Sequence, residues 1–82
     1  MKITVKYFLN IEKLIGKNID EFEFSNEKSL KEILEKNIDK EKMEKLKDLT
    51  LIITKNGENC KDLNVEIENN NVFCLCPAIY GG

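Results

Sequence analysis

Histidine, arginine and tryptophan are absent from this 82-residue sequence, and proline occurs once. Without histidine, the chain lacks the usual general base and the commonest metal ligand. It therefore has no Ser–His or Cys–His pair for nucleophilic catalysis. All 13 basic residues are lysines, against 15 Asp and Glu, so the basic excess and guanidinium forks typical of nucleic-acid binding are also missing. We therefore expect neither an enzyme nor a nucleic-acid-binding protein.

Long apolar runs are absent too. No stretch approaches the roughly 18 residues of a membrane span, and the first residues alternate instead of forming the apolar block of a signal peptide. The three cysteines are an odd number, which is unlike a secreted disulfide framework. These features predict a cytoplasmic protein that does not associate with membranes. The length allows one small domain with a modest core.

Two alternating segments near the start predict a β-hairpin. Residues 2–8 place apolar side chains on one face, as in a half-buried strand, and residues 19–24 alternate in the same way. The segment 10–16 between them has helical spacing and ends in Gly16, which suits a left-handed helix end. We therefore expect a strand, one short helical turn and a returning strand.

The strongest helix signal begins at Ser29. Together with Glu32 it forms an S-x-x-E capping box. Apolar residues then follow at helical spacing and predict one stripe that packs on a sheet: Leu30, Ile33, Leu34 and Ile38. Residues 39–48 predict a second helix, which we expect to be short and peripheral because only Met43 and Leu46 face inward.

The second half of the chain predicts further strands. Residues 49–55 form a strong strand pattern, and Asn56-Gly57 after it is the preferred signal for a tight hairpin turn into a brief return strand. A run of three asparagines then marks another turn. Val72 to Cys76 is expected as the last strand, with Pro77 ending it. The pattern predicts a two-layer α+β domain over residues 1–77 and a tail over 78–82.

The tail carries the group that we expect to take part in chemistry. It reads Ala78-Ile79-Tyr80-Gly81-Gly82 and would end in the α-carboxylate of Gly82. A free carboxylate is an anion at neutral pH and a poor electrophile, so it must be activated, for example as an acyl-adenylate in the nucleotide site of another protein. Without Cβ atoms, Gly81 and Gly82 would pass through a narrow channel and adopt any backbone angle that the site requires.

An apolar patch is expected on the sheet face opposite the helix. Side chains from three strands should meet there and bind a partner: Phe8, Ile52, Cys74 and Cys76. The two cysteines share a strand face, and with Cys60 they would supply thiolates to a metal or redox site. Without histidine and a fourth cysteine, a structural zinc site is not expected. We interpret the cysteines as small apolar surface residues. The alternative is that one of them is a local thiol that exchanges with the acyl group of an activated tail.

Both ends of the sequence resemble one family. The ending Cys76-Pro77-Ala78-Ile79-Tyr80-Gly81-Gly82 is similar to the F-P-P-V-x-G-G ending of molybdopterin synthase small subunits, the MoaD-like proteins. The segment from Tyr7 to Gly16 resembles the F-x-x-x-R-E-L-x-G segment of the same family, with Glu12 and Lys13 in inverted charge order. The likeness covers essentially the whole chain.

The resemblance implies a fold, partners and a role. The fold is a ubiquitin-like β-grasp, a mixed sheet with one main helix on one face and a flexible C-terminal Gly-Gly tail. An E1-like, MoeB-like enzyme would adenylate Gly82 with ATP, and conversion to a thiocarboxylate would let the chain donate sulfur for molybdopterin biosynthesis. A large MoaE-like synthase subunit would be the second partner. Both partners would contact the patch and three further residues: Pro77, Ile79 and Tyr80. The chain itself would bind no metal or cofactor.

Two other acceptors fit the same Gly-Gly ending. A ubiquitin-like modifier would use an activated Gly82 to form an isopeptide with a target lysine. A sulfur carrier of thiamine synthesis or of another pathway would pass the sulfur to a different acceptor. The acceptor is not part of this chain, so the sequence leaves these alternatives open.

Overall fold

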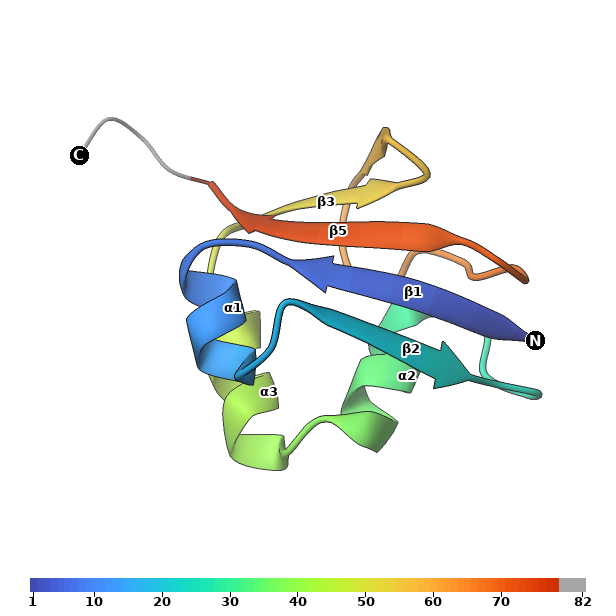
Figure 1. Cartoon of the computed structure of the whole chain (residues 1–82), viewed down its shortest axis with the longest axis horizontal. Helices are drawn as coiled ribbons and strands as arrows, with labels where there is room; N and C mark the ends of the chain where they lie inside the picture. Colours follow the sequence, from blue (N-terminus) through green and yellow to red (C-terminus); the bar gives the residue numbers. More distant parts are fainter. Residues whose placement is uncertain (79–82) are drawn as a thin grey trace.

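The computed structural model describes residues 1–78 and, within them, arranges five strands and three helices in two layers (Figure 1). In chain order these elements are β1 (Lys2–Tyr7), α1 (Asn10–Ile15), β2 (Ile19–Glu23), α2 (Leu30–Asn37), α3 (Lys40–Lys47), β3 (Leu51–Lys55), β4 (Glu58–Cys60) and β5 (Val72–Pro77). The strand order is β2-β1-β5-β3-β4. Strands β1 and β5 are parallel, and the other neighbouring pairs are antiparallel.

The predicted hairpin is confirmed. Strands β1 and β2 pair antiparallel, with Ile3 opposite Phe22, and α1 lies between them in the chain. Gly16 ends α1 in the left-handed conformation with φ 95°, and its N–H donates to the carbonyl of Glu12 at 2.8 Å. The alternation of β1 also holds, because Ile3, Val5 and Tyr7 are all buried. This alternation leaves the even-numbered side chains of β1 on the opposite sheet face.

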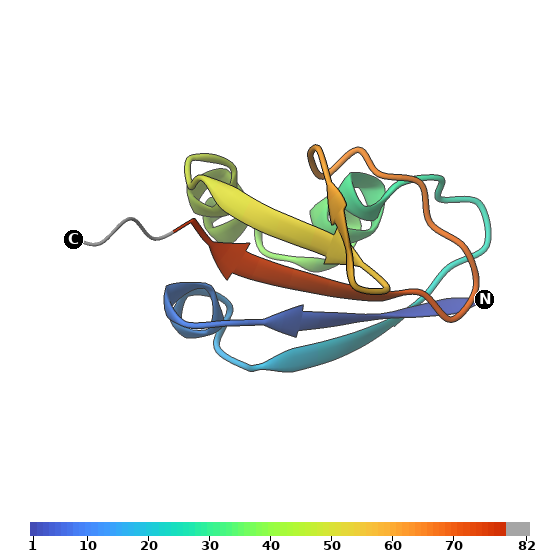
Figure 2. The ribbon, with the colours of Figure 1, turned by 90° about the horizontal axis from the view of Figure 1, so that it is seen from above.

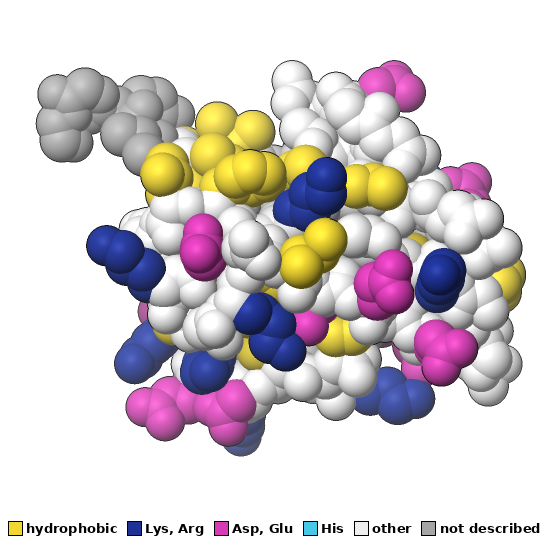
Figure 3. Space-filling model, in the orientation of Figure 1, with side chains coloured by type: hydrophobic (Ala, Val, Ile, Leu, Met, Phe, Trp, Pro, Cys, Tyr) yellow, Lys and Arg dark blue, Asp and Glu magenta, His cyan; other side chains and the backbone are white. Residues whose placement is uncertain are grey.

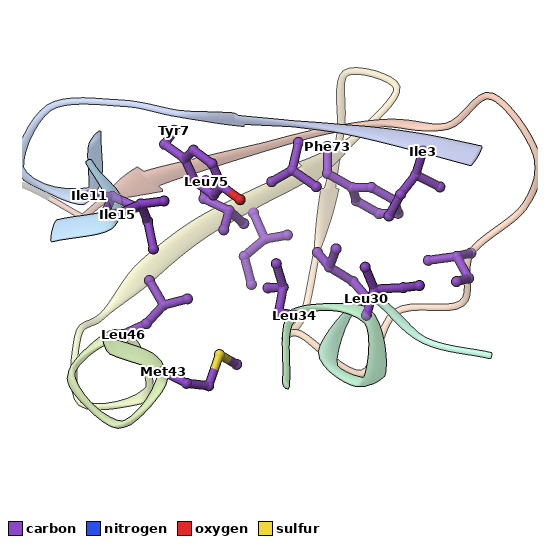
Figure 4. Close-up of a cluster of buried hydrophobic side chains, with 14 of the residues drawn as sticks. Ile3, Tyr7, Ile11, Ile15, Leu30, Leu34, Met43, Leu46, Phe73 and Leu75 are labelled. Atoms are coloured by element: carbon purple, nitrogen blue, oxygen red, sulfur yellow. The ribbon is translucent and has the colours of Figure 1, made fainter. Parts of the chain in front are cut away.

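Helix α2 begins as predicted, with one difference in its cap. The Ser29 hydroxyl accepts from the N–H of Glu32 at 3.2 Å. The Glu32 carboxylate accepts in return from the N–H of Lys28 at 2.9 Å, one residue before the expected donor. The apolar stripe packs into the core (Figure 4), where Leu30, Ile33 and Leu34 are fully buried.

Helix α3 forms where the sequence predicts it, and its two buried residues are the two expected to face inward. It has eight residues, as many as α2, and the Asp39 carboxylate accepts from the N–H groups of its first turn. Leu46 and Met43 are buried and point toward the sheet (Figure 4). The Lys42 ammonium donates to the carbonyl of Ile15 at 3.2 Å, which links α3 to α1. The main helix α2 therefore shares its face of the sheet with two other helices (Figure 1).

Asparagine and glycine form the turns that the sequence predicts. Asn56 and Gly57 have φ values of 50° and 88°, as a two-residue hairpin turn between β3 and β4 requires. Asn70 has φ 70°, and its N–H donates to the carbonyl of Lys2 at 2.7 Å. These turns set up the return of β5 through the middle of the sheet (Figure 2). In the described part of the chain, no helix has the length and apolarity needed to span a bilayer.

Candidate functional site

Strand β5 carries the chain to the predicted tail and is held on both sides. It pairs with β1 in parallel and with β3 in antiparallel register. Phe73 and Leu75 are fully buried and anchor it to the core. The strand includes Pro77 rather than ending before it, and the N–H of Ala78 still donates to the carbonyl of Thr50 at 2.9 Å. The chain is therefore fixed to the body through Ala78.

The residues predicted to carry the chemistry follow directly. Gly81 and Gly82, with the proposed contacts Ile79 and Tyr80, lie outside the described residues. Their roles remain predictions. The structure describes the end of β5 and Ala78, which directly precede them in the chain.

The predicted outer patch comes together on the side of the sheet away from the helices. Cys76 pairs with Ile52 on β3, and the N–H of Phe8 donates to the carbonyl of Leu75 at 3.0 Å, so Phe8 also lies beside β5. Phe8 is 41% exposed and Ile52 is 47% exposed, while Cys74 and Cys76 are half-buried between their neighbours. Apolar side chains gather along this edge of the molecule (Figure 3). We call these four residues the docking patch: Phe8, Ile52, Cys74 and Cys76.

Pro77 differs from the other predicted contact residues. It pairs with Leu51 and is buried, on the same side of β5 as Phe73 and Leu75. Its ring is therefore not part of the docking patch. A role for Pro77 in partner contact would be to fix the direction in which the chain leaves β5, since its ring restricts φ to about −65°.

The cysteines do not form one cluster. Cys60 pairs with Ile53, whose side chain is buried beneath the sheet, and it packs against the core. Cys74 pairs with Thr54 in the same strand β3, so it lies on the opposite face. All three are free thiols, and no group of three potential metal ligands occurs within residues 1–78. This placement agrees with the interpretation of Cys74 and Cys76 as small apolar surface residues.

A partly buried hydrogen bond, which the sequence does not reveal, involves Tyr7 at the end of β1, directly before Phe8. The Tyr7 hydroxyl donates to the Asp20 carboxylate at 2.9 Å, and Lys17 pairs with the same carboxylate at 3.0 Å. Burial raises the pKa of Tyr7 well above its ordinary value, and the bond and negative charge of Asp20 raise it further. Tyr7 therefore stays protonated at physiological pH. The bond ties β1 to β2 and fixes the backbone that leads to Phe8.

The surface beside the end of β5 is largely apolar. The docking patch offers apolar side chains and thiols, and Lys6 lies opposite Cys74 in the β1–β5 register. The chain has no histidine, the usual general base.

Solved structures resemble this chain, whereas protein-family models and curated sequences do not. No protein-family model and no curated protein matches the chain. The putative molybdopterin converting factor subunit 1 of Pyrococcus furiosus superposes with a TM-score of 0.72 at 22% identity, covering 96% of this chain and 99% of that one. The SAMP1 protein of Haloferax volcanii superposes with a TM-score of 0.76 at 14% identity over the full length of both chains.

The chain has a ubiquitin-like β-grasp fold. A third similar structure is a complex of subunits 1 and 2 of the molybdopterin-converting factor from Helicobacter pylori, with a TM-score of 0.65 and 22% identity over the full length of both chains. The fold predicted from the resemblance is confirmed, including its mixed sheet and its main helix α2. In this β-grasp domain, the parallel pair β1–β5 is central to the sheet (Figure 2).

Proposed function

We propose that this β-grasp domain is a non-catalytic carrier whose Gly82 carboxylate is activated by a partner enzyme and then carries sulfur. One observation carries the proposal. Strand β5, which precedes the tail in the chain, is anchored on both sides, and its last residues lie beside the exposed Phe8 and Ile52. A partner that binds this patch would receive the tail in its own active site.

The proposed chemistry has two steps. An oxygen of the Gly82 carboxylate attacks the α-phosphorus of ATP, which forms an acyl-adenylate and releases pyrophosphate. A persulfide on a partner protein then attacks the acyl carbon, AMP leaves, and a thiol reductant cleaves the resulting acyl disulfide to give the thiocarboxylate. The first step makes the carbonyl carbon electrophilic, which the free anion is not.

The proposed partners follow from the chemistry and from the similar structures. A MoeB-like adenylating enzyme would supply the nucleotide site and the ATP, and this chain would bind neither on its own. A MoaE-like large synthase subunit would take the sulfur into molybdopterin. The Helicobacter pylori complex, in which a structurally similar subunit 1 is bound to subunit 2, supports this second partner. The docking patch would serve both, one after the other.

Protein modification is the second candidate, and a specific observation favours it. The Haloferax volcanii protein, solved also as small archaeal modifier protein 1, has the same fold, with TM-scores of 0.76 and 0.73 in the two structures. A modifier would use the same acyl-adenylate but transfer Gly82 to a lysine. Intact-mass spectrometry of the chain purified from its native host separates the two.

A thiocarboxylate replaces one oxygen by sulfur and adds about 16 mass units, since only that atom of the activated carboxyl changes. We expect this species for a sulfur carrier, and lysine-linked conjugates for a modifier. A chain found only as the free carboxylate, both in cells and after incubation with the adenylating enzyme, ATP and a sulfur donor, would contradict the carrier proposal.

A further inference from the structure

Leu9, between β1 and α1, has backbone angles that suit glycine. Its φ is 56° and its ψ is −127°. The N–H of Ile11 donates to the carbonyl of Phe8 at 3.1 Å, so residues 8–11 form a β-turn with Leu9 at the first central position. These angles are those of a type II′ turn, in which glycine is strongly preferred at that position because a Cβ atom is crowded there.

Neither full burial nor a helix cap within residues 1–78 compensates for this choice of residue. The Leu9 side chain is 57% exposed, so it gains little from burial. It occupies the N-cap position of α1 and makes no side-chain hydrogen bond to the helix, where Ser, Asp, Asn or Gly is preferred. Leucine at position 9 is therefore unfavourable for the backbone, for the helix cap and for hydration. The stability of the free domain does not explain it.

The position of Leu9 offers an explanation. It directly follows Phe8, which belongs to the docking patch and is bonded through its N–H to Leu75. Leu75 lies three residues before Ala78, the last described residue. The connection between β1 and α1 lies at the edge of the molecule where β5 ends (Figure 1), beside the exposed apolar surface (Figure 3). Leu9 is thus an exposed apolar residue next to Phe8 in the chain, at the end of the molecule where β5 ends.

We propose that Leu9 is a docking residue for the adenylating enzyme, held in a strained turn that lowers the stability of the free domain. The inference rests on the proposed carrier function. The tail must enter the nucleotide site of the enzyme while the body of the domain stays outside. The surface that flanks the entrance of that site therefore meets the edge around Ala78, and Leu9 supplies apolar contact there.

Stability provides the first test. Leu9→Gly removes the crowded Cβ atom, and we expect the melting temperature to rise by about 4 °C or more, even though glycine adds freedom to the unfolded chain. Leu9→Met is the matched control, because it keeps an apolar side chain and the strained backbone. We expect its melting temperature to equal that of the unchanged protein. A lower melting temperature for Leu9→Gly would show that leucine is needed by the fold and would overturn the proposal.

Binding provides the second test. The full-length chain and both variants are titrated into the purified adenylating enzyme of the same organism, and the KM for the carrier is measured in ATP–pyrophosphate exchange. We expect Leu9→Gly to weaken the Kd about tenfold or more and to raise KM with kcat unchanged, while Leu9→Met stays near the original values. A Kd for Leu9→Gly equal to that of the unchanged chain would overturn the proposal.

The failure of this inference can be told apart from failure of the carrier function. If the unchanged chain supports exchange and Leu9→Gly binds equally well, only the role of Leu9 is wrong. If the unchanged chain neither binds the enzyme nor supports exchange, the carrier function itself is wrong and the docking role falls with it.

Discussion

Replacing Phe8 by Glu tests the docking patch. Phe8 is 41% exposed in the free domain, and we expect that fraction to be covered in the complex with the adenylating enzyme. A phenylalanine side chain offers about 150–250 Å² of surface, so this fraction corresponds to roughly 80 Å². At about 25 cal/mol per Å² the loss is roughly 2 kcal/mol, or about thirtyfold in Kd. A carboxylate buried without a partner in the complex would weaken binding further.

The assay is isothermal titration calorimetry with the purified enzyme, together with a thermal melt of each variant. The matched control is Asn26→Glu, which adds the same charge at an exposed site in the loop after β2, at the other end of the sheet from Phe8. We expect Phe8→Glu to lose binding by more than thirtyfold while still melting cooperatively. Asn26→Glu should bind normally. An unaltered Kd for Phe8→Glu would remove the patch from the interface and refute the reasoning.

Two further predictions concern the body of the domain. Leu34 is fully buried, so Leu34→Asp should abolish the cooperative melt seen by circular dichroism, because burying an unpaired carboxylate costs several kcal/mol of a total stability of about 5–15 kcal/mol; a normal melt would contradict the packing of α2. The hydrogen bond from Lys36, at 2.7 Å, lowers the pKa of Glu27 from 4.5 to about 2. The ionised Glu27 therefore stabilises the folded domain fully above pH 4.5, and this stabilisation is lost as the pH falls through about 2. Glu27→Gln should therefore lower the melting temperature by more at pH 7 than at pH 2, and a difference that stays constant with pH would contradict this assignment.

Local signals in the sequence predict most of the elements. Ser29 caps a helix and Asn56-Gly57 makes a turn because each acts on backbone groups only a few residues away. The amphipathic stripe of α2 likewise appears in the sequence, because helical periodicity alone decides which residues face inward. These features depend little on the rest of the fold, so a single sequence is enough to predict them.

Long-range features are less accessible. The parallel pairing of β1 with β5 joins residues about seventy positions apart, such as Thr4 and Val72, and no local pattern encodes that register. The extent of β5 past Cys76 depends on the carbonyl of Thr50, which accepts from the N–H after Pro77. The sequence also gives no sign that Leu9 has positive φ, since leucine is rare in that region. Each of these depends on contacts between distant segments.

The docking patch falls between these cases. Alternation in β1 predicts that Phe8 faces away from Ile3 and Val5, and the structure confirms this. The sequence also predicts Ile52 on this face, and the β3–β5 register confirms it by pairing Ile52 with Cys76. The sequence thus identifies the residue types, and the fold brings them together.

Truncation of the tail tests the central claim most directly. In ATP–pyrophosphate exchange with the adenylating enzyme, deleting Gly82 moves the carboxylate back by about 3.3–3.6 Å, and a misplacement near 1 Å can already cost about a hundredfold in rate. Gly82→Ala keeps the carboxylate in place but adds a methyl group that the channel must accept. We expect the deletion, and an extension by one residue, to abolish exchange without changing the thermal melt, and Gly82→Ala to reduce exchange partially. Exchange at the original rate by the Gly82 deletion would contradict the account.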